Sequence, residues 1–356
     1  MFFGSQNEQY YVGVDFGTRS VKAVEIRVKK DKPELVNYGW VTLDQVASHP
    51  IDVAAVAAGA TTDTPDYAEL LRRALKLLLE GVDPKAKNVN VAIPAFNGLV
   101  MTVDFPLMSD EELAQAIQYE ARKYIPTSLE DVNISWDRAR VDKEAKKMQV
   151  ILVAAPKSEV QYYDNLFEGT NVKVDALELE TFALVRSLVG ADKGRYLLLD
   201  IGSKTTNLVY VEDGLVQLNR NIDVGGTDLT STIAENLNIS VKRAQEMKEG
   251  GKNFFSGPMP LVFPSLDYIV GEVNRVLGSQ KSDAIDAIIL SGGSARFGGL
   301  VDYISKATNL KVTIGNPLSR VVIDPKVAQY VEKKTGSGLS VAIGLALRAA
   351  ENTDKK

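Results

Sequence analysis

The chain has 356 residues, 45% of them hydrophobic, and a formal net charge of -5 at pH 7. This length is sufficient for two packed lobes, each with its own core. The chain contains no cysteine and a single histidine, which excludes disulfide bonds, thiolate metal sites and histidine clusters. No long run of like charges provides a surface for polyanions, so nucleic acid is not an expected partner.

The two ends of the chain predict a cytoplasmic location without direct membrane insertion. The N-terminal residues have neither a basic start nor an apolar run, so they do not read as a secretion signal. The most hydrophobic stretch, residues 339–350, contains Arg348 and is shorter than the roughly 20 apolar residues that cross a bilayer.

Two β-hairpins of closely related sequence are predicted. Residues 10–17 and 21–28 alternate between apolar and other side chains, which indicates two strands around a short turn. From Tyr196 the chain repeats an apolar strand, a small polar turn and a second strand. The turn DFGTRS at residues 15–20 matches DIGSKT at residues 200–205, position for position. This match predicts a duplicated lobe.

The segment between the hairpins predicts a small α+β subdomain inserted into the first lobe. A helix is expected to start after Ser109, because Glu112 completes a capping box. It should run to about Tyr124, since Pro126 disfavours its continuation. Further elements are expected around it: strands over residues 88–95, 132–141 and 148–155, and a helix over 158–167.

The chain beyond the second hairpin is predicted to be mainly helical. Gly225 and Gly226 precede a helix that ends near Asn236, and a break rich in Gly and Pro covers residues 250–264. A buried strand then leads into a glycine turn at residues 291–296, where backbone can approach a ligand closely. Two further helices are expected over residues 241–249 and 266–277.

The repeated turns have the composition of a phosphate-binding site. Phosphate chains require several backbone N–H donors at close range, and glycine permits both the tight turn and the approach. Hydroxyl side chains add donors, and an aspartate before the turn can hold Mg²⁺ through water. One such turn would indicate only an ordinary hairpin loop. Two turns that match position for position predict two facing hairpins that bind the phosphates of a nucleotide from both sides. Neither a G-x-x-x-x-G-K-[ST] loop nor a G-x-G-x-x-G opening a βαβ unit is present.

These motifs resemble the phosphate-1, phosphate-2 and adenosine motifs of the actin, heat-shock chaperone and sugar kinase superfamily. Within it, the chain resembles the PilM family of type IV pilus assembly proteins over nearly its whole length. The likeness is carried by FPLMSDEELAQAIQYEARKYIPTSLEDVN, VAAPKSEV, TTNLVYVEDG, GGTDLT, LSGGSARFGGL and VAIGLALR. It implies an α/β actin-like fold, of the duplicated ribonuclease H-like type, with two lobes and an inserted α+β subdomain.

The resemblance also implies a division into domains and assigns partner docking to the insertion. The implied parts are a lobe 1 core at residues 1–99, 175–194 and 336–356, the insertion at 100–174, a lobe 2 core at 195–222 and 284–335, and a nucleotide-side subdomain of lobe 2 at 223–283.

ATP and Mg²⁺ are the ligands that the resemblance implies. Asp15 and Asp200 would hold Mg²⁺ through water, and Glu180 would orient the water that attacks ATP. Lys248 belongs to a helical motif that contacts ribose and base, in which Gln245 replaces the usual glutamate. Gly225 and Gly226 would approach the nucleotide from behind, and Gly292 and Gly293 would lie at its adenosine. The residues that would line the phosphates are Gly17, Thr18, Arg19, Gly202, Ser203, Lys204 and Thr205.

The implied function is that of an ATP-binding cytoplasmic adaptor in a type IV pilus or related assembly platform, peripheral to the inner membrane through a partner. That partner would be a PilN-like bitopic membrane protein, whose short cytoplasmic N-terminal peptide docks on the insertion. A pilus motor or platform protein and self-association are further interactions that the resemblance admits. Hydrolysis of ATP is expected to be slow if it occurs, because Glu180 is the only evident carboxylate for orienting water.

Two other functions remain open. A filament-forming cytoskeletal ATPase like FtsA or MreB is one, although an FtsA-type protein would be expected to carry a C-terminal amphipathic membrane helix, and this sequence ends in AENTDKK directly after its last helix. A small-molecule kinase of the same superfamily is the other, and it would need polar substrate contacts for which no second motif is found. A substrate-dependent ADP assay separates the kinase from the adaptor.

Overall fold

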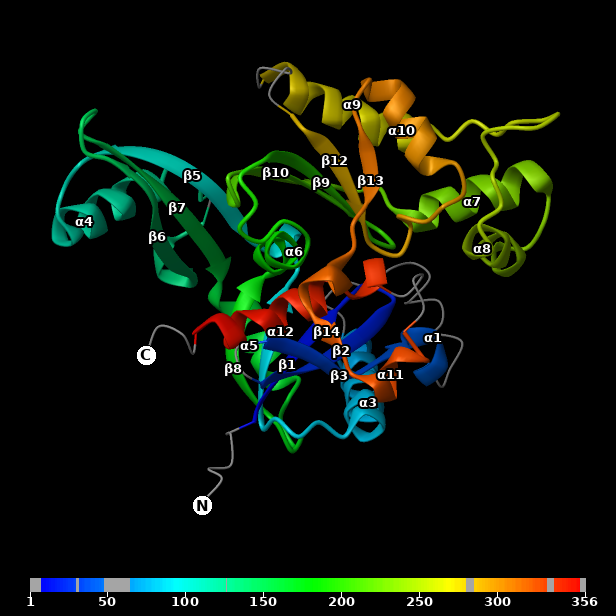
Figure 1. Cartoon of the computed structure of the whole chain (residues 1–356), viewed down its shortest axis with the longest axis horizontal. Coiled ribbons are helices and arrows are strands. Elements are labelled where there is room, and N and C mark those ends of the chain that lie inside the picture. The colour runs from blue at the N-terminus through cyan, green and yellow to red at the C-terminus, as the bar shows by residue number, and fades with distance from the viewer. Residues whose placement is uncertain are drawn as a thin grey trace.

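Two β-sheets with helices on both faces form two lobes, one above the other in Figure 1. The computed structural model describes residues 8–29, 32–47, 65–125, 127–279, 285–331 and 336–352. Over these ranges one sheet has six strands and the other has eight. No helix within the same ranges has both the length and the apolar character needed to cross a membrane.

The elements fall into three groups. Lobe 1 contains β1 (Gln9–Phe16), β2 (Ser20–Lys29), β3 (Lys32–Thr42), α1 (Leu43–Val46), α3 (Pro65–Val82), β4 (Asn88–Ile93), η1 (Ala95–Asn97), α5 (Lys157–Asn165), β8 (Lys173–Leu179), α6 (Glu180–Leu188), β14 (Val322–Ile323), α11 (Pro325–Ala328), η5 (Gly336–Leu339) and α12 (Ser340–Asn352). Lobe 2 contains β9 (Arg195–Ile201), β10 (Thr206–Glu212), β11 (Leu215–Ile222), α7 (Gly226–Leu237), α8 (Val241–Glu249), α9 (Pro264–Ser279), β12 (Ala287–Ser291), α10 (Leu300–Thr308) and β13 (Val312–Ile314), and η4 (Pro317–Arg320) connects it to lobe 1. We propose to end the lobe 2 core, expected at 284–335, before β14, because β14 pairs with β3 of lobe 1. The insertion contains β5 (Leu99–Pro106), α4 (Asp110–Ala121), η2 (Leu129–Asp131), β6 (Val132–Asp142) and β7 (Lys147–Pro156).

The sheet of lobe 1 has the strand order β14-β3-β2-β1-β4-β8. The first predicted hairpin is confirmed as the antiparallel pair β1 and β2, and β4 lies parallel to β1. Val12 and Val14 of β1 share a buried core with Leu71 of α3. On the opposite face, a Cβ on Gly13 would lie 2.2 Å from the carbonyl oxygen of Ala342 in α12. Because alternate residues of a strand point to opposite faces, α3 and α12 cover the two sides of this sheet.

Lobe 2 repeats this arrangement. Its strands β13-β12-β9-β10-β11 have the same order as β8-β4-β1-β2-β3, with the same parallel and antiparallel pairings. The register repeats as well, since Asp15 pairs with Lys22 and Asp200 pairs with Asn207. Helices α7, α9 and α10 cover the outer face of this sheet through a shared core. The predicted duplication is confirmed, as is the two-lobed α/β fold.

Helices α6 and α12 lie between the two sheets, as Figure 1 shows. They touch backbone to backbone, since a Cβ on Gly344 of α12 would come within 1.9 Å of the carbonyl oxygen of Ala183 in α6. Arg186 of α6 reinforces the contact, because its NH1 donates to the Gly344 carbonyl at 2.9 Å and to Oε1 of Glu178 at 2.7 Å. Leu184 of α6 also shares a buried core with Val209 of β10, so the lobe 2 sheet packs on this closely packed helix pair.

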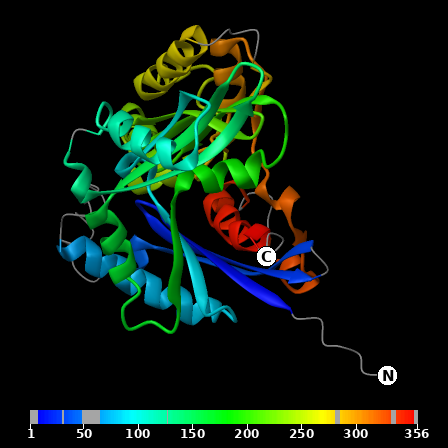
Figure 2. The ribbon, with the colours of Figure 1, turned by 90° about the vertical axis from the view of Figure 1, so that its left-hand side faces the viewer.

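The insertion has its own core and an N-terminal cap of the predicted type. Ser109 N donates to Glu112 Oε2 at 2.9 Å and Glu112 N donates to Ser109 Oγ at 3.3 Å, which confirms the capping box. Leu113 and Ile117 of α4 are fully buried against β7 in a core that includes Met148. In Figure 2 this unit faces the viewer.

The insertion is attached to both lobes. The chain enters it from β4 of lobe 1, but its strands β5, β7 and β6 extend the sheet of lobe 2. The seam between β11 and β5 has a single register pair, Leu218 with Met101. The hydroxyl of Thr102 adds a hydrogen bond to the carbonyl oxygen of Val216, at 2.6 Å.

The chain returns from the insertion through α5, which packs on lobe 1. The rings of Tyr163 and Phe167 lie 5.6 Å and 5.9 Å from that of Phe16, between ring centroids. The expected insertion, residues 100–174, includes this helix. We propose to limit the insertion to the segment from β5 to β7, because only that segment shares the separate core.

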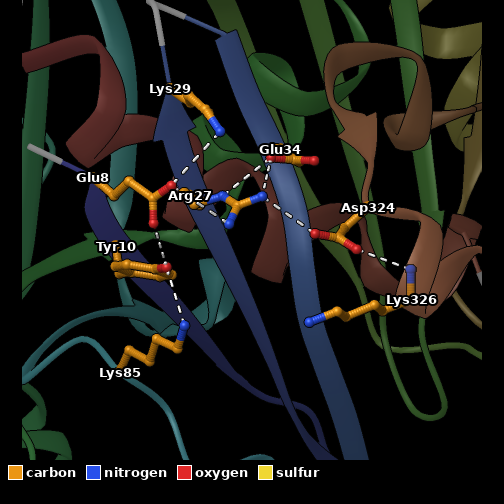
Figure 3. A network of polar contacts seen from close by, with 8 residues as sticks. All are labelled: Glu8, Tyr10, Arg27, Lys29, Glu34, Lys85, Asp324 and Lys326. Carbon is orange, nitrogen blue, oxygen red and sulfur yellow. Dashed lines mark hydrogen bonds and ion pairs between the residues drawn. The ribbon is translucent and has the colours of Figure 1, made fainter. Parts of the chain in front are cut away.

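A polar network closes the outer end of lobe 1 (Figure 3). The NH2 group of Arg27 donates to Glu34 at 2.5 Å and to Asp324 at 3.2 Å, so β2 holds both β3 and the segment that follows β14. In the same view Tyr10 donates to Glu8 at 3.0 Å and accepts from Lys85 at 3.1 Å. These contacts fix the end of the sheet that lies opposite the two polar turns.

Candidate functional site

The two polar turns have the same geometry as well as related sequences. Gly17 N donates to the carbonyl oxygen of Ser20 at 2.9 Å, and Gly202 N donates to that of Thr205 at 3.0 Å. A Cβ on Gly17 would lie 3.1 Å from the Ser20 oxygen, and one on Gly202 would lie 2.9 Å from the Thr205 oxygen. A side chain would therefore crowd the second turn and leave little room in the first, so glycine suits the start of both.

The loop before α7 packs directly on the second turn. Gly226 N donates to the Gly202 carbonyl at 2.8 Å and Thr227 N donates to that of Ser203 at 2.7 Å. A Cβ on Gly225 would lie 2.7 Å from the carbonyl carbon of Ser203, so this approach of two backbones needs glycine. The amino end of α7 is thus held against the second turn.

The glycine turn at residues 291–296 also packs against the second polar turn. Gly292 has a positive φ of 85°, and a Cβ there would lie 2.5 Å from the carbonyl oxygen of Ile201 in the second turn. A Cβ on Gly226 would lie 2.2 Å from the hydroxyl oxygen of Ser294. By contrast, a Cβ on Gly293 would meet no atom within 4 Å, so contacts within the chain do not explain the glycine there.

Lys248 lies beneath these glycines. Its side chain is buried, and Nζ donates to the Gly226 carbonyl at 2.5 Å. Burial lowers its pKa to about 8, and the positive charge of Arg19 contributes in the same direction, partly opposed by Glu249. Since Arg19 belongs to the first turn and Lys248 to lobe 2, this influence acts from one lobe on the other.

Arg19, an expected phosphate contact, and Gln245, which replaces the usual glutamate of the ribose motif, both make other contacts in this structure. Arg19 donates from NH2 to Oδ2 of Asp44 in α1 at 2.8 Å, and both side chains are more than a third exposed. Gln245 is held within lobe 2, because its Oε1 accepts from Thr230 and its Nε2 donates to Glu249, both at 2.6 Å. The remaining turn residues, Thr18, Lys204 and Thr205, lie half-buried in their turns.

An acidic cluster with one internal cation lies between the turns. Asp15 is 4% exposed and accepts from Nζ of Lys22 at 3.0 Å. Burial raises the pKa of Glu180 to about 8, with further contributions from Asp200 and Asp15. Burial also raises the pKa of Asp200 to about 6, although Ser291 and Lys22 oppose the shift. Burial lowers the pKa of Lys22, but the charges of the three acids outweigh it and the net pKa is raised.

These mutual effects show that the cluster brings together groups from both lobes. Asp15 and Lys22 come from the first hairpin, Asp200 from the second, and Glu180 from the start of α6. Glu180 is held in place because its Oε1 accepts from the backbone N of Ala95 at 3.0 Å. Three carboxylates and one ammonium leave a surplus of two negative charges when all are ionised.

This arrangement fits Mg²⁺ bound through water rather than directly. Among the described residues, no group of three or more His, Asp or Glu side chains is arranged to hold a metal ion. Mg²⁺ retains several waters in most protein sites, and a surplus of two negative charges matches its charge. Asp15 and Asp200 would then accept hydrogen bonds from metal-bound water.

Sequence reasoning missed two residues of the site, Lys22 and Asn207. Each lies seven residues after the aspartate of its turn and directly across the hairpin from it. The spacing was visible in the sequence, but its meaning depends on the register of the strands, which determines whether side chains seven residues apart are neighbours.

A separate pocket of about 470 Å³ opens at the other end of β1. It lies between the first residues of β1, β4 and β8 and the last turn of α12. Its lining includes Tyr10, Lys87, Asn90, Asp175 and Arg348, so it is polar and carries charges of both signs. It contains none of the residues expected to bind nucleotide.

Comparison with known proteins agrees with this architecture. A solved structure described as the PilM-PilN type IV pilus biogenesis complex has a TM-score of 0.78 and 23% identity, and the match covers 96% of this chain and 98% of that one. MreB5 of Spiroplasma citri bound to AMPPNP has a TM-score of 0.56 and 14% identity, with 98% and 97% covered. Cell division protein FtsA of Pseudomonas aeruginosa is 22% identical over an alignment of 399 positions that covers 95% of this chain and 93% of that protein.

The sequence model of the family described as type IV pilus assembly protein PilM matches residues 13–350. This range includes both polar turns, the loop at Gly225 and Gly226, the glycine turn at residues 291–296 and the insertion. The chain therefore belongs to the PilM family of type IV pilus assembly proteins and has the actin-like two-lobed fold.

Proposed function

We propose that the chain binds ATP-Mg²⁺ between its lobes and acts as an adaptor in type IV pilus assembly. The observation that carries the nucleotide part is the convergence of two turns of the same geometry and the acidic cluster, with its surplus of two negative charges when all its groups are ionised. The turns supply backbone N–H donors from both sides, and the carboxylates supply the place for the metal. The structure of MreB5 bound to AMPPNP supports the proposal through its shared fold.

The residues take the roles expected from the sequence. Asp15 and Asp200 hold Mg²⁺ through water, and the two turns line the phosphates. Gly293, whose Cβ position is open, lies beside the adenosine. Lys248 supports the loop at Gly226 from behind. Arg19 must leave Asp44 to reach a phosphate, and their ion pair is exposed enough to exchange readily.

The experiment is calorimetric titration of ATP with wild type and Asp200→Ala, in Mg²⁺ and in EDTA. In Mg²⁺ the substitution should weaken binding at least about tenfold, because a carboxylate facing the metal is lost. In EDTA it removes a negative charge from beside the phosphates, so ATP should bind equally or more tightly. Asp137→Ala, an exposed site on β6, is the matched control. Equal ATP-Mg²⁺ affinity in Asp200→Ala and wild type would refute the site assignment.

For the adaptor role, we propose that the insertion docks the N-terminal peptide of a PilN-like membrane protein. The solved PilM-PilN complex supports a partner of this kind. A groove beneath α4 is not available, since Leu113 and Ile117 fill that space. The insertion instead offers the free edge of β6, at the end of the sheet, for main-chain pairing with an extended peptide. It also carries exposed apolar side chains at Leu107, Tyr119, Tyr124 and Val141.

The pocket beside β8 is the rival docking place, and one experiment separates the two. Leu99 and Ala154 are paired in register, so a short linker can replace the segment from β5 to β7 without separating the ends. Asp175→Lys reverses a charge in the pocket and leaves the insertion intact. A fluorescently labelled peptide should bind wild type and Asp175→Lys equally and fail to bind the linker variant. Loss only in Asp175→Lys would move the docking place to the pocket.

A further inference from the structure

Asn207 is a buried amide next to the proposed metal site. It lies on β10 directly across from Asp200, so both side chains are on the same face of the sheet. That face packs toward lobe 1, because Val209 on the same strand belongs to the core shared with Leu184 of α6. Asn207 is only 3% exposed.

A chain of hydrogen bonds fixes the orientation of this amide. Thr181 Oγ1 donates its single proton to Oδ1 of Asn219 at 3.0 Å. Thr181 can therefore only accept from Asn207, whose Nδ2 donates to it at 3.3 Å. Oδ1 of Asn207 is left without a partner among the described residues and is shielded from solvent. A buried acceptor without a donor destabilises a folded chain, so this one calls for an explanation.

The duplicated hairpin shows what is unusual about this position. In lobe 1 the equivalent residue is Lys22, which donates to the aspartate of its own turn. In lobe 2 the aspartate faces a neutral amide instead. Lobe 1 thus brings its own cation to the site, whereas lobe 2 presents an acceptor beside Asp200.

We infer that Oδ1 of Asn207 accepts a hydrogen bond from a water molecule of the Mg²⁺ hydration shell, an inference that rests on the proposed binding of ATP-Mg²⁺. The phosphates of ATP are ionised at neutral pH and only accept hydrogen bonds, so they cannot satisfy this oxygen. Metal-bound water is a donor, and Mg²⁺ keeps several waters when it binds. Thr181 and Asn219 are positioning residues, because they set which end of the amide faces the site.

The test is calorimetric titration of Asn207→Leu, which has nearly the same shape and no polar group. Its affinity for ATP-Mg²⁺ should fall about fivefold to thirtyfold, as expected for one hydrogen bond to a polarised donor. Its affinity for ATP in EDTA should equal that of wild type. The melting temperature of the free protein should be unchanged or higher, because an unpaired acceptor has been removed.

Asn90→Leu is the matched control. Asn90 is equally buried, but its Nδ2 donates to the carbonyl oxygen of Leu345 at 3.0 Å, away from the turns. This variant should melt at a lower temperature and bind ATP-Mg²⁺ like wild type. Thr181→Val provides a second, smaller perturbation, since it frees the amide of Asn207 to rotate. This variant should also bind ATP more weakly than wild type in Mg²⁺ and equally in EDTA.

The outcomes distinguish this inference from the function on which it rests. Wild-type binding of ATP-Mg²⁺ together with unchanged affinity in Asn207→Leu and Thr181→Val would overturn the inference and leave the nucleotide site standing. An affinity loss of equal size in Mg²⁺ and EDTA would also overturn it, since the lost contact would not involve metal-bound water. Absence of ATP-Mg²⁺ binding by wild type would refute both. Should Asn207→Leu fail to fold, Thr181→Val carries the test.

Discussion

Substitutions in the ion pair between Lys22 and Asp15 test the electrostatics of the site most directly. The side chains are 24% and 6% exposed, and Nζ lies 3.0 Å from Oδ2. Replacing Lys22 by Met keeps the aliphatic volume but leaves Asp15 as a buried charge and removes the one positive charge of the cluster. Removing one partner of a buried pair costs about 3–5 kcal/mol, and the partial exposure of Lys22 places this case near 3 kcal/mol.

The double variant Lys22→Met with Asp15→Asn should recover most of that loss. A neutral pair of similar shape leaves no buried charge, so we expect a total cost of about 1 kcal/mol. The assay is urea unfolding of wild type, both single variants and the double variant at pH 7.5 in EDTA, followed by circular dichroism. If the double variant is destabilised by the full sum of the two single effects, the residues are not coupled and the account of the cluster fails.

Three further predictions follow from the packing and charges. Gly344→Ala should lower the free energy of unfolding by about 1–3 kcal/mol, because the added methyl group would meet Ala183. In the same urea titration Gly271→Ala should be neutral or stabilising, because Gly271 is exposed on α9 and has open space around its Cβ position. In EDTA, the urea midpoint should fall as the pH rises from about 6 to 8.5. The cause is Glu180, whose pKa of about 8 lets the folded chain keep a proton that the unfolded chain has already released. Glu180→Gln should remove most of this fall. ATP turnover without a partner should stay below roughly 1 per second in a coupled ADP assay; faster turnover would contradict Glu180 as the sole carboxylate for orienting water.

Features set by local sequence were predicted well. The capping box at Ser109, the duplicated hairpins and helix α8, expected over 241–249 and observed at Val241–Glu249, depend on residues close together in the chain. Helix α4 ends three residues earlier than expected, at Ala121, because the backbone tightens there: Tyr124 N donates to the carbonyl oxygen of Ala121 at 3.1 Å.

Features that depend on contacts between distant segments were not predicted. The pairing of Arg19 with Asp44 joins residues 25 positions apart and cannot be read from the turn motif. The role of Lys22 depends on strand register, and the seam between β11 and β5 joins Leu218 to Met101 across more than a hundred residues. Such contacts follow from the assembled sheets rather than from any one segment.

The seam gives the insertion a mechanical property. Its chain is anchored in lobe 1, yet its sheet continues that of lobe 2 at one register pair and one side-chain hydrogen bond, and Arg140 of β6 adds an ion pair to Asp213 of lobe 2. Any rotation of one lobe against the other must therefore tilt the insertion or shear this narrow junction. A rigid body held at two points in this way acts as a lever, turning a small change of angle at the helix pair α6 and α12 into a larger displacement at the far tip between β6 and β7.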